Sequence, residues 1–189
     1  MPQKSVTIRS KKKFLLLQSR PETEASDNEY EAFCALGNID PAMITRIRMD
    51  RGELPEINLE EYAGVIMGGG PANFVYSHNQ KSEAQKVFEP WLFNLFGHIV
   101  ALDKPFLGAC LGFSLAVKYL GGTVSFDYGE PIHAVGVTLS PAAAEDRLLE
   151  GIPHTFTAFV GHKEGAITVP HGAIELARST TCAQMLRIG

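Results

Sequence analysis

The stretch Lys104-Pro-Phe-Leu-Gly-Ala-Cys-Leu-Gly-Phe-Ser-Leu-Ala-Val-Lys118 decides the fold, because it places a cysteine between two glycines where an apolar strand meets a helix. We interpret it as a nucleophile elbow, a sharp strand-to-helix turn that projects the Cys110 side chain into a cleft. Gly108 and Gly112 remove the side chains that would clash with such a turn. The amide of Leu111, which opens the helix, is expected to face an oxyanion or a thiolate.

A second glycine motif lies in Tyr62-Ala-Gly-Val-Ile-Met-Gly-Gly-Gly-Pro-Ala-Asn73, where a short apolar strand runs into three glycines and a proline. Consecutive glycines let the main chain approach a ligand closely and turn its amides outward. We therefore expect Gly69 or Gly70 to supply another N–H group near Cys110. Simpler alternatives are a tight turn for this loop and a buried cysteine beside packing glycines for the elbow.

Strand patterns alternate with helical patterns along the chain, which predicts βαβ units and a mostly parallel sheet. Strands are expected at residues 14–18, 43–49 and 64–67, and helices at 26–36, at 82–88 and again from Pro90. The C-terminal part is richer in strand patterns, at residues 123–126, 134–139, 155–160 and 174–177. Groups at the carboxyl ends of parallel strands gather at one edge of the sheet, and both glycine motifs fall there.

Four segments in the same order resemble the class I glutamine amidotransferases, which use a Cys-His-Glu triad. They are the two glycine motifs, Phe156-Thr-Ala-Phe-Val-Gly-His-Lys-Glu164, and a later Leu-Ala-Arg-Ser segment. Among the branches of the family, the chain is most similar to stand-alone proteins related to the glutaminase subunit of GMP synthase, from Phe14 onward. The resemblance implies a three-layer α/β sandwich with a mostly parallel central sheet and a flavodoxin-like core.

The resemblance also implies a mechanism in which the Cys110 thiolate attacks the side-chain carboxamide of L-glutamine. Amides of Leu111 and of Gly69 or Gly70 would hold the oxyanion, ammonia would leave, and water would hydrolyse the thioester to glutamate. The expected partner is an ammonia-accepting synthase subunit, and no cofactor is expected. Gly112 and Ser114 would complete the substrate site, although the family typically carries Gln where this chain has the shorter Ser114.

Two further segments are expected near this pocket. Tyr128-Gly-Glu-Pro-Ile-His133 resembles the segment that walls the glutamine pocket, so Tyr128 is a pocket candidate. His162 is a second candidate, which the resemblance places in a supporting turn and not as the base. Glu164 could orient a histidine, but we expect it to be solvated or salt-bridged.

The general base of the family lies in a Gln-Phe-His-Pro-Glu motif, which does not occur in the 189 residues. The last residues, 181–189, resemble the strand and turn that precede this motif. The expected organisation is therefore a basic leader at residues 1–13, then an amidotransferase-like domain at 14–189 that stops before its His-Glu motif.

Composition sets the remaining bounds. The 189 residues are 45% hydrophobic, which is typical of one globular domain. Their net charge of −4 does not indicate binding to nucleic acid or to an anionic membrane. Three widely spaced cysteines argue against a disulfide framework and favour the cytoplasm. The histidines show no metal-ligand spacing and there is no phosphate-binding loop, so neither a metal nor ATP chemistry is expected.

Two other functions are compatible with the same residues. A catalytically inactive homologue that binds a ligand or a partner protein would explain the missing base and Ser114. A cysteine-dependent α/β hydrolase acting on esters or lactones would share the elbow, but the Gly-Gly-Gly-Pro loop and the order of the segments count against it. The ammonia acceptor and the oligomeric state stay open at this point.

Overall fold

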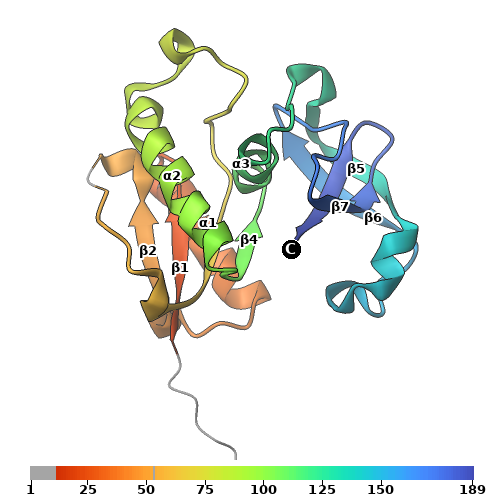
Figure 1. Ribbon diagram of the computed structural model, residues 1–189, viewed down its shortest axis with the longest axis horizontal. Coiled ribbons are helices and arrows are strands. Elements are labelled where there is room, and N and C mark those ends of the chain that lie inside the picture. The colour runs from red at the N-terminus through yellow and green to blue at the C-terminus, as the bar shows by residue number, and fades with distance from the viewer. Residues whose placement is uncertain (1–11, 53) are drawn as a thin grey trace, which may run out of the picture.

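The computed structural model describes residues 12–52 and 54–189, which form two four-stranded sheets (Figure 1). The first sheet contains β1 (Lys13–Gln18), β2 (Ile44–Arg48), β3 (Tyr62–Met67) and β4 (Phe106–Gly108). All of its pairings are parallel and its strand order is β2-β1-β3-β4. This order is that of a flavodoxin-like sheet, in which ligands bind outside the carboxyl ends of the strands.

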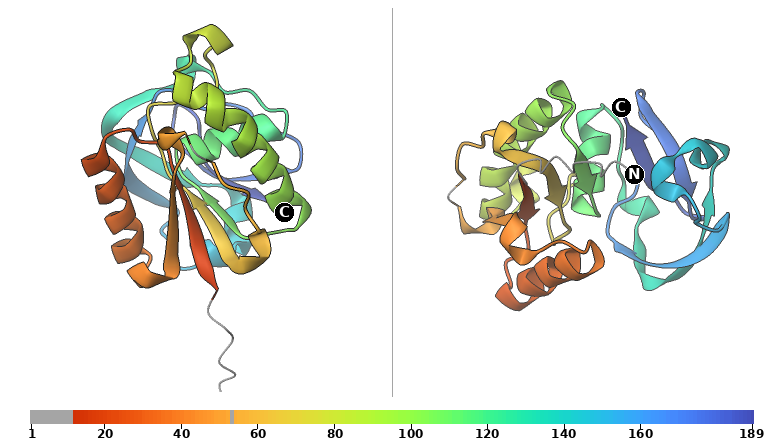
Figure 2. Two further views of the ribbon diagram at one scale, coloured as in Figure 1. Left: turned by 90° about the vertical axis from the view of Figure 1, so that its left-hand side faces the viewer. Right: turned by 90° about the horizontal axis from the view of Figure 1, so that it is seen from below.

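Helices cover both faces of the parallel sheet. Figure 2 shows α1 (Thr23–Leu36) on one face, with α2 (Glu83–Ala101) and α3 (Leu111–Tyr119) on the other. Side chains of β1 pack against the helices on both faces of the sheet, because successive side chains of a strand point to opposite faces. Leu16 packs in the cluster with Cys34 of α1, whereas Leu15 and Leu17 pack in the cluster formed with α2 and α3. The expected three-layer α/β sandwich with a parallel central sheet is confirmed.

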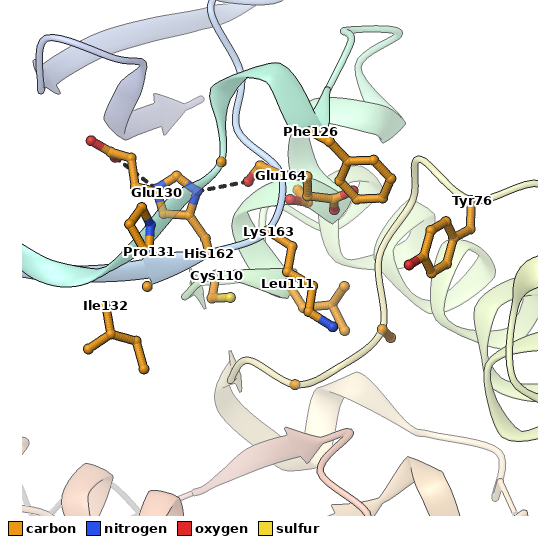
Figure 3. A pocket seen from close by; sticks show the side chains of 15 residues that line it. Tyr76, Cys110, Leu111, Phe126, Glu130, Pro131, Ile132, His162, Lys163 and Glu164 are labelled. Atoms are coloured by element: carbon orange, nitrogen blue, oxygen red, sulfur yellow. Dashed lines mark hydrogen bonds and ion pairs between the residues drawn. The ribbon is translucent and has the colours of Figure 1, made fainter.

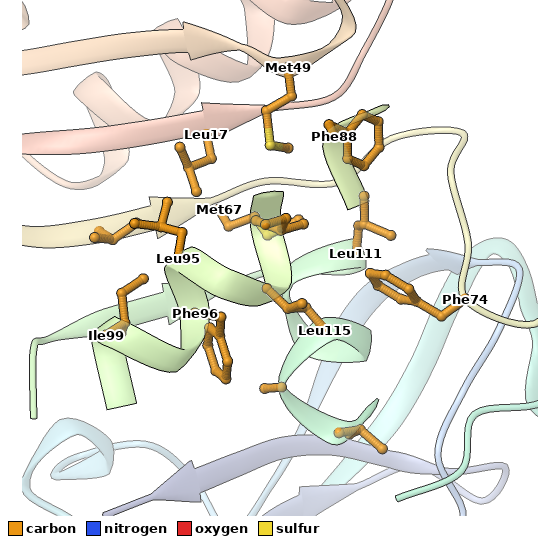
Figure 4. Close-up of a cluster of buried hydrophobic side chains, with 14 of the residues drawn as sticks. Leu17, Met49, Met67, Phe74, Phe88, Leu95, Phe96, Ile99, Leu111 and Leu115 are labelled. Carbon is orange, nitrogen blue, oxygen red and sulfur yellow. The ribbon is translucent and has the colours of Figure 1, made fainter. Parts of the chain in front are cut away.

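The larger core lies between the sheet and the α2 and α3 layer (Figure 4). Leu17 and Met67 of the strands are fully buried, and so is Leu115 of α3. Each such side chain contributes about 1.5–3 kcal/mol of hydrophobic stabilisation. Helix α3, which follows the turn that carries Cys110, is therefore anchored in this core.

Strand register sets the position of the two glycine motifs. In the β3–β4 pairing Met67 lies opposite Gly108, and the N–H of Ala109 donates to the carbonyl of Met67 at 2.9 Å. Because both strands end at this pair, the chain leaves β3 and β4 side by side. The Gly68–Gly70 loop and Cys110 therefore emerge at the same edge of the sheet.

The second sheet is antiparallel, with the order β6-β5-β7-β8, and lies beside α3 and β4 (Figure 1). Its strands are β5 (Glu130–Leu139), β6 (Thr155–His162), β7 (Ala173–Arg178) and β8 (Ala183–Ile188). It has a small core of its own around Val137, Leu139 and Ala177. Leu186 and Ile188 of β8 also pack against the larger core, which ties the two sheets together.

Two expectations about secondary structure are wrong. The predicted helix boundary at Pro90 is absent, because α2 runs through this proline as one helix. Pro90 removes only one backbone donor, and burial of Phe88, Leu92 and Leu95 on one face outweighs its cost of about 3 kcal/mol. The predicted strand at residues 123–126 is reduced to a single bridge between Ser125 and Gly165, followed by a 3₁₀ turn.

The predicted leader at residues 1–13 falls mostly outside the described residues. Within them, Lys13 is the first residue of β1.

Candidate active site

Cys110 occupies a strained turn between β4 and α3. Its backbone has φ 53° and ψ −100°, a conformation that L-residues rarely adopt and that costs on the order of 1–3 kcal/mol. A side chain on Gly108 would come within 2.7 Å of the backbone of Gly112, so both glycines are required for the close approach of strand and helix. The turn leaves Cys110 exposed, as expected for a nucleophile.

The glycine loop after β3 comes into contact with the elbow. A Cβ added to Gly69 would lie 3.3 Å from the Cys110 sulfur and 3.1 Å from Nη2 of Arg20. The N–H of Gly69 is already used, because it donates to Oε1 of Glu29 at 3.0 Å. The next amide, that of Gly70, approaches the Cys110 sulfur instead. Of the two predicted amides, only that of Gly70 is directed at the thiol.

The electrostatic environment of Cys110 contains opposing influences. Desolvation by the surrounding walls raises the pKa of the thiol above its usual range, even though part of the residue is exposed. The N–H groups of Gly70 and Leu111 oppose this rise by stabilising the thiolate, and so does the positive charge of Arg20. The carboxylate of Glu164 raises the pKa further. In this arrangement the thiol form predominates at neutral pH.

Two hollows meet at Cys110. The larger has a volume of about 630 Å³ and is lined by several of the predicted site residues, namely Gly70, Cys110, Leu111, Ser114 and His162. The smaller, of about 280 Å³, lies between the elbow and β8. Cys110, His162 and Glu164 border both hollows, and Figure 3 shows the larger one.

Three predicted site residues lie outside these walls. Gly69 donates its N–H to Glu29, and Gly112 packs against Met67. Tyr128 was expected to line the pocket, but it does not border either hollow. The chain forms a 3₁₀ turn here instead of a strand, which presents Phe126 and Gly129 to the larger hollow. Phe126 stacks edge-on against Tyr76, with ring centroids 5.3 Å apart.

Both ring nitrogens of His162 are engaged (Figure 3). Nε2 lies 2.9 Å from the Glu130 carboxylate, and Nδ1 lies 3.0 Å from the backbone carbonyl of Glu164. His162 therefore links β5, β6 and the following turn, and both of its ring nitrogens already have protein partners.

Glu130 is the centre of a buried hydrogen-bond network. Its oxygens accept from Ser179 at 3.1 Å and from Gln184 at 2.6 Å, in addition to His162. Desolvation would raise the pKa of this carboxyl, but hydrogen bonds from His162, Thr181, Gln184 and Ser179 together hold it below its usual value.

Cys182 belongs to the same network. Burial and the neighbouring Glu130 raise the pKa of its thiol to about 11. Ligand atoms of Glu130, His162 and Cys182 lie within 4.8 Å of one another, a clustering that sequence spacing did not predict. We assign these groups to a hydrogen-bonded core, because Glu130 already accepts several protein donors and Cys182 is held as a thiol.

Glu164 corrects another expectation. It is neither solvated nor salt-bridged but only 7% exposed, and its Oε2 accepts the N–H groups of Phe74 at 2.9 Å and Val75 at 3.2 Å. These bonds tie the turn after β6 to the segment that follows the glycine loop. Burial raises the pKa of Glu164, and the nearby hydroxyl of Ser114 opposes the rise. The one sequence signal that Glu164 contributes to the site was its position two residues after His162.

No helix in residues 12–52 and 54–189 combines the length and apolarity needed to cross a membrane.

A strained turn that carries Cys110 and a Gly-rich loop lie together at the carboxyl edge of the parallel sheet, which makes this an α/β protein of flavodoxin-like topology. The family model "Glutamine amidotransferase class-I" matches residues 30–187, so the chain belongs to this family. Curated relatives include a subunit of the glutamine-hydrolyzing GMP synthase of Methanospirillum hungatei, 32% identical over 119 residues, which are 63% of this chain and 53% of that protein. The corresponding GMP synthase subunit of Sulfurisphaera tokodaii is 29% identical over 67% of this chain and 60% of its own length.

Solved structures agree with this assignment. A glutamine amidotransferase of Methylobacillus flagellatus is 26% identical with a TM-score of 0.68, over 94% of this chain and 66% of that one. A glutamine amidotransferase of Thermotoga maritima has a TM-score of 0.70 at 23% identity, over 94% of this chain and 72% of that one, and supports the fold alone. The chain spans little more than half the length of the two GMP synthase subunits that it matches.

Proposed function

We propose that the chain is a glutaminase domain that hydrolyses the side-chain amide of L-glutamine through a Cys110 thioester and supplies ammonia to a synthase partner. The observation that carries the proposal is the pairing of a strained, exposed Cys110 with two converging N–H groups, those of Gly70 and Leu111. Two such donors are what a tetrahedral oxyanion on the attacked carbon requires. The relatives that are subunits of GMP synthase favour a synthase as the ammonia acceptor.

The proposed reaction has two halves. The Cys110 thiolate attacks the carboxamide carbon, and the oxyanion forms against the Gly70 and Leu111 amides. The C–N bond then breaks, and a proton must reach the nitrogen before ammonia leaves. Water next attacks the thioester, the C–S bond breaks, and glutamate is released. Each half needs a group that accepts and returns a proton.

A second candidate function is the binding of a small ligand or partner without catalysis. It is favoured by the state of His162, which is the one histidine among the described residues lining the two hollows and has both nitrogens engaged. The raised pKa of the Cys110 thiol also favours it, because a thiol is a weak nucleophile.

Ammonia release from glutamine separates the two functions. The 189-residue chain is compared with Cys110→Ala and with Cys34→Ala, whose cysteine lies in the cluster on the α1 face. Any longer product that the gene encodes is measured beside them. Release that disappears in Cys110→Ala and persists in Cys34→Ala supports the glutaminase. Glutamine binding without ammonia release in every version supports the non-catalytic function.

Labelling with 6-diazo-5-oxo-L-norleucine, a glutamine analogue that alkylates thiols, gives a readout independent of turnover. Mass spectrometry of the intact chain should show one adduct, and the adduct should be absent from Cys110→Ala. An excess of glutamine should slow the labelling. Labelling at Cys110 that glutamine does not slow would argue against a glutamine pocket.

A further inference from the structure

Two aromatic side chains form one end of the larger hollow at Cys110. Tyr76 comes from the segment that follows the glycine loop, and Phe126 comes from the 3₁₀ turn after α3. Both border the hollow and their rings meet edge-on, with centroids 5.3 Å apart. Figure 3 shows this aromatic pair on one side of Cys110, with Pro131 and Ile132 on the other. The hollow therefore extends from the thiol to an aromatic wall.

The aromatic pair is held in place by polar groups of its own loops. The N–H of Tyr76 donates to Oδ1 of Asn73 at 2.9 Å, and Asn73 is only 1% exposed. Ser125 forms a β-bridge with Gly165, and its hydroxyl caps the turn that carries Phe126. Side chains that are ordered before a ligand arrives lose little conformational entropy when they bind it.

Both rings are partly uncovered. Tyr76 is 37% exposed and Phe126 is 40% exposed. Ala72 and Leu111 border the same hollow, so the aromatic pair is not its only apolar surface. Hollows lined by aromatic and apolar side chains with a few polar groups are typical of small-molecule sites. An apolar group that covers the two rings gains hydrophobic contact with them.

The hollow is also larger than free glutamine requires. Its volume of about 630 Å³ falls in the range of about 300–1,000 Å³ that accommodates drug-sized ligands. Glutamine is much smaller than such ligands and is polar at both ends. It therefore offers no apolar group to cover Tyr76 and Phe126 while its carboxamide lies at Cys110.

We propose that the aromatic pair is a subsite for an aromatic or bulky apolar group attached to a glutamine unit, so that the Cys110 site acts on a glutamine derivative larger than the free amino acid. This inference rests on the proposed function. If the group is attached at the α-nitrogen, water and the carboxamide still give a γ-carboxylate and ammonia. If it is attached at the amide nitrogen, the same C–N bond breaks, that nitrogen takes the proton, and an amine leaves in place of ammonia.

Calorimetry with two matched pairs of ligands tests the subsite and locates the attachment. N-Benzoyl-L-glutamine is compared with N-acetyl-L-glutamine, and the γ-benzylamide of L-glutamate is compared with the γ-methylamide. Within each pair the ligands differ by the aromatic ring, because the lost charge or N–H group is common to both. L-Glutamine is measured beside them. Every titration uses the full chain carrying Cys110→Ala, so that turnover does not interfere.

In one of the two pairs, the aromatic ligand should bind about 10- to 100-fold more tightly than its small partner, because the ring covers Tyr76 and Phe126. Adding Phe126→Ala should abolish most of this preference. Tyr76→Ala should do the same, and it keeps the test decisive if the first variant does not fold. Phe159→Ala is the matched control, because Phe159 is 85% exposed on β6, does not border the larger hollow and should leave the preference unchanged.

The outcomes separate the subsite from the proposed function. Binding of glutamine without an aromatic preference in either pair would overturn the subsite and leave the glutaminase proposal standing. A preference that persists unchanged in folded Phe126→Ala and Tyr76→Ala chains would do the same. A preference confined to the γ-amide pair would support the subsite and count against the supply of ammonia to a synthase. Failure of all five ligands to bind would overturn the proposed function and the subsite with it.

Discussion

Oε1 of Glu29 accepts the N–H of Gly69 at 3.0 Å, so a helix on one face of the sheet holds the glycine loop that meets Cys110. The same carboxylate pairs with Nε of Arg20 at 3.1 Å, and Arg20 favours the Cys110 thiolate. A Cβ on Gly68 would come within 2.6 Å of the Glu29 carboxylate atoms, which shows how closely the loop is fitted to this side chain. Glu29 is thus a positioning residue for the Gly68–Gly70 loop.

Glu29→Ala should therefore weaken the site as well as the fold. We expect the free energy of unfolding to fall by about 1–3 kcal/mol, because the Gly69 amide and Arg20 lose a charged acceptor. Labelling of Cys110 by the diazo glutamine analogue should slow about tenfold, since the loop that faces the attacked carbon is no longer fixed. Urea denaturation and timed mass spectrometry measure the two effects. Glu31→Ala, at an exposed glutamate of the same helix, should change neither, and equal effects in both variants would contradict the assignment.

Gly108→Ala should destabilise the elbow. A Cβ at Gly108 would lie 2.6 Å from the Phe106 ring and 2.7 Å from the backbone of Gly112, so the strand and α3 must separate. We expect a loss of about 1–3 kcal/mol in the free energy of unfolding. Gly136→Ala in β5 is the matched control, because nothing lies within 4 Å of its added Cβ. Denaturant midpoints of the two variants should differ clearly, and similar midpoints would mean that the elbow tolerates separation.

The rate of Cys110 alkylation by iodoacetamide should rise with pH and reach its midpoint above the usual range for a thiol. Desolvation raises the pKa of Cys110, and only the thiolate reacts. Glu164→Gln should move the midpoint to lower pH, because it removes a negative charge that raises this pKa. Arg20→Met should move it to higher pH, because it removes a positive charge that lowers it. Cys110→Ser corrects for slow labelling of the two buried cysteines, Cys34 and Cys182. Shifts in the opposite directions would refute this electrostatic description.

Glu130→Gln should reduce stability most at neutral pH. Hydrogen bonds from His162, Thr181, Gln184 and Ser179 outweigh the desolvation that would raise the pKa of Glu130, so the folded-state pKa lies below the unfolded one. The ionised carboxylate therefore stabilises the fold above the unfolded pKa, and this contribution is lost as the pH falls through the lower folded pKa. Urea denaturation at several pH values should show the difference between the chain and Glu130→Gln shrinking below about pH 4. Glu145→Gln, an exposed control, should lack this pattern.

Much of the site follows from local sequence. Gly108 and Gly112 flank Cys110 at the spacing that a strand-to-helix turn needs, and the run of glycines after β3 marks a loop that approaches another group. These patterns are readable because turn geometry depends on residues within a few positions of one another. The limits of local reading appear at Pro90, where a proline predicts a helix boundary but burial along one face of α2 keeps the helix continuous.

The class of the fold, the turn that carries Cys110 and the family of the chain could all be predicted from the sequence, since each depends on short-range patterns in a fixed order. The amide that faces the thiol, the two partners of the His162 ring and the burial of Glu164 could be learned only from the folded chain. The Gly69–Glu29 contact joins residues 40 apart and the Phe74–Glu164 contact joins residues 90 apart. Such contacts depend on how strands pair and sheets pack across the whole chain, and that information is absent from any local stretch of sequence.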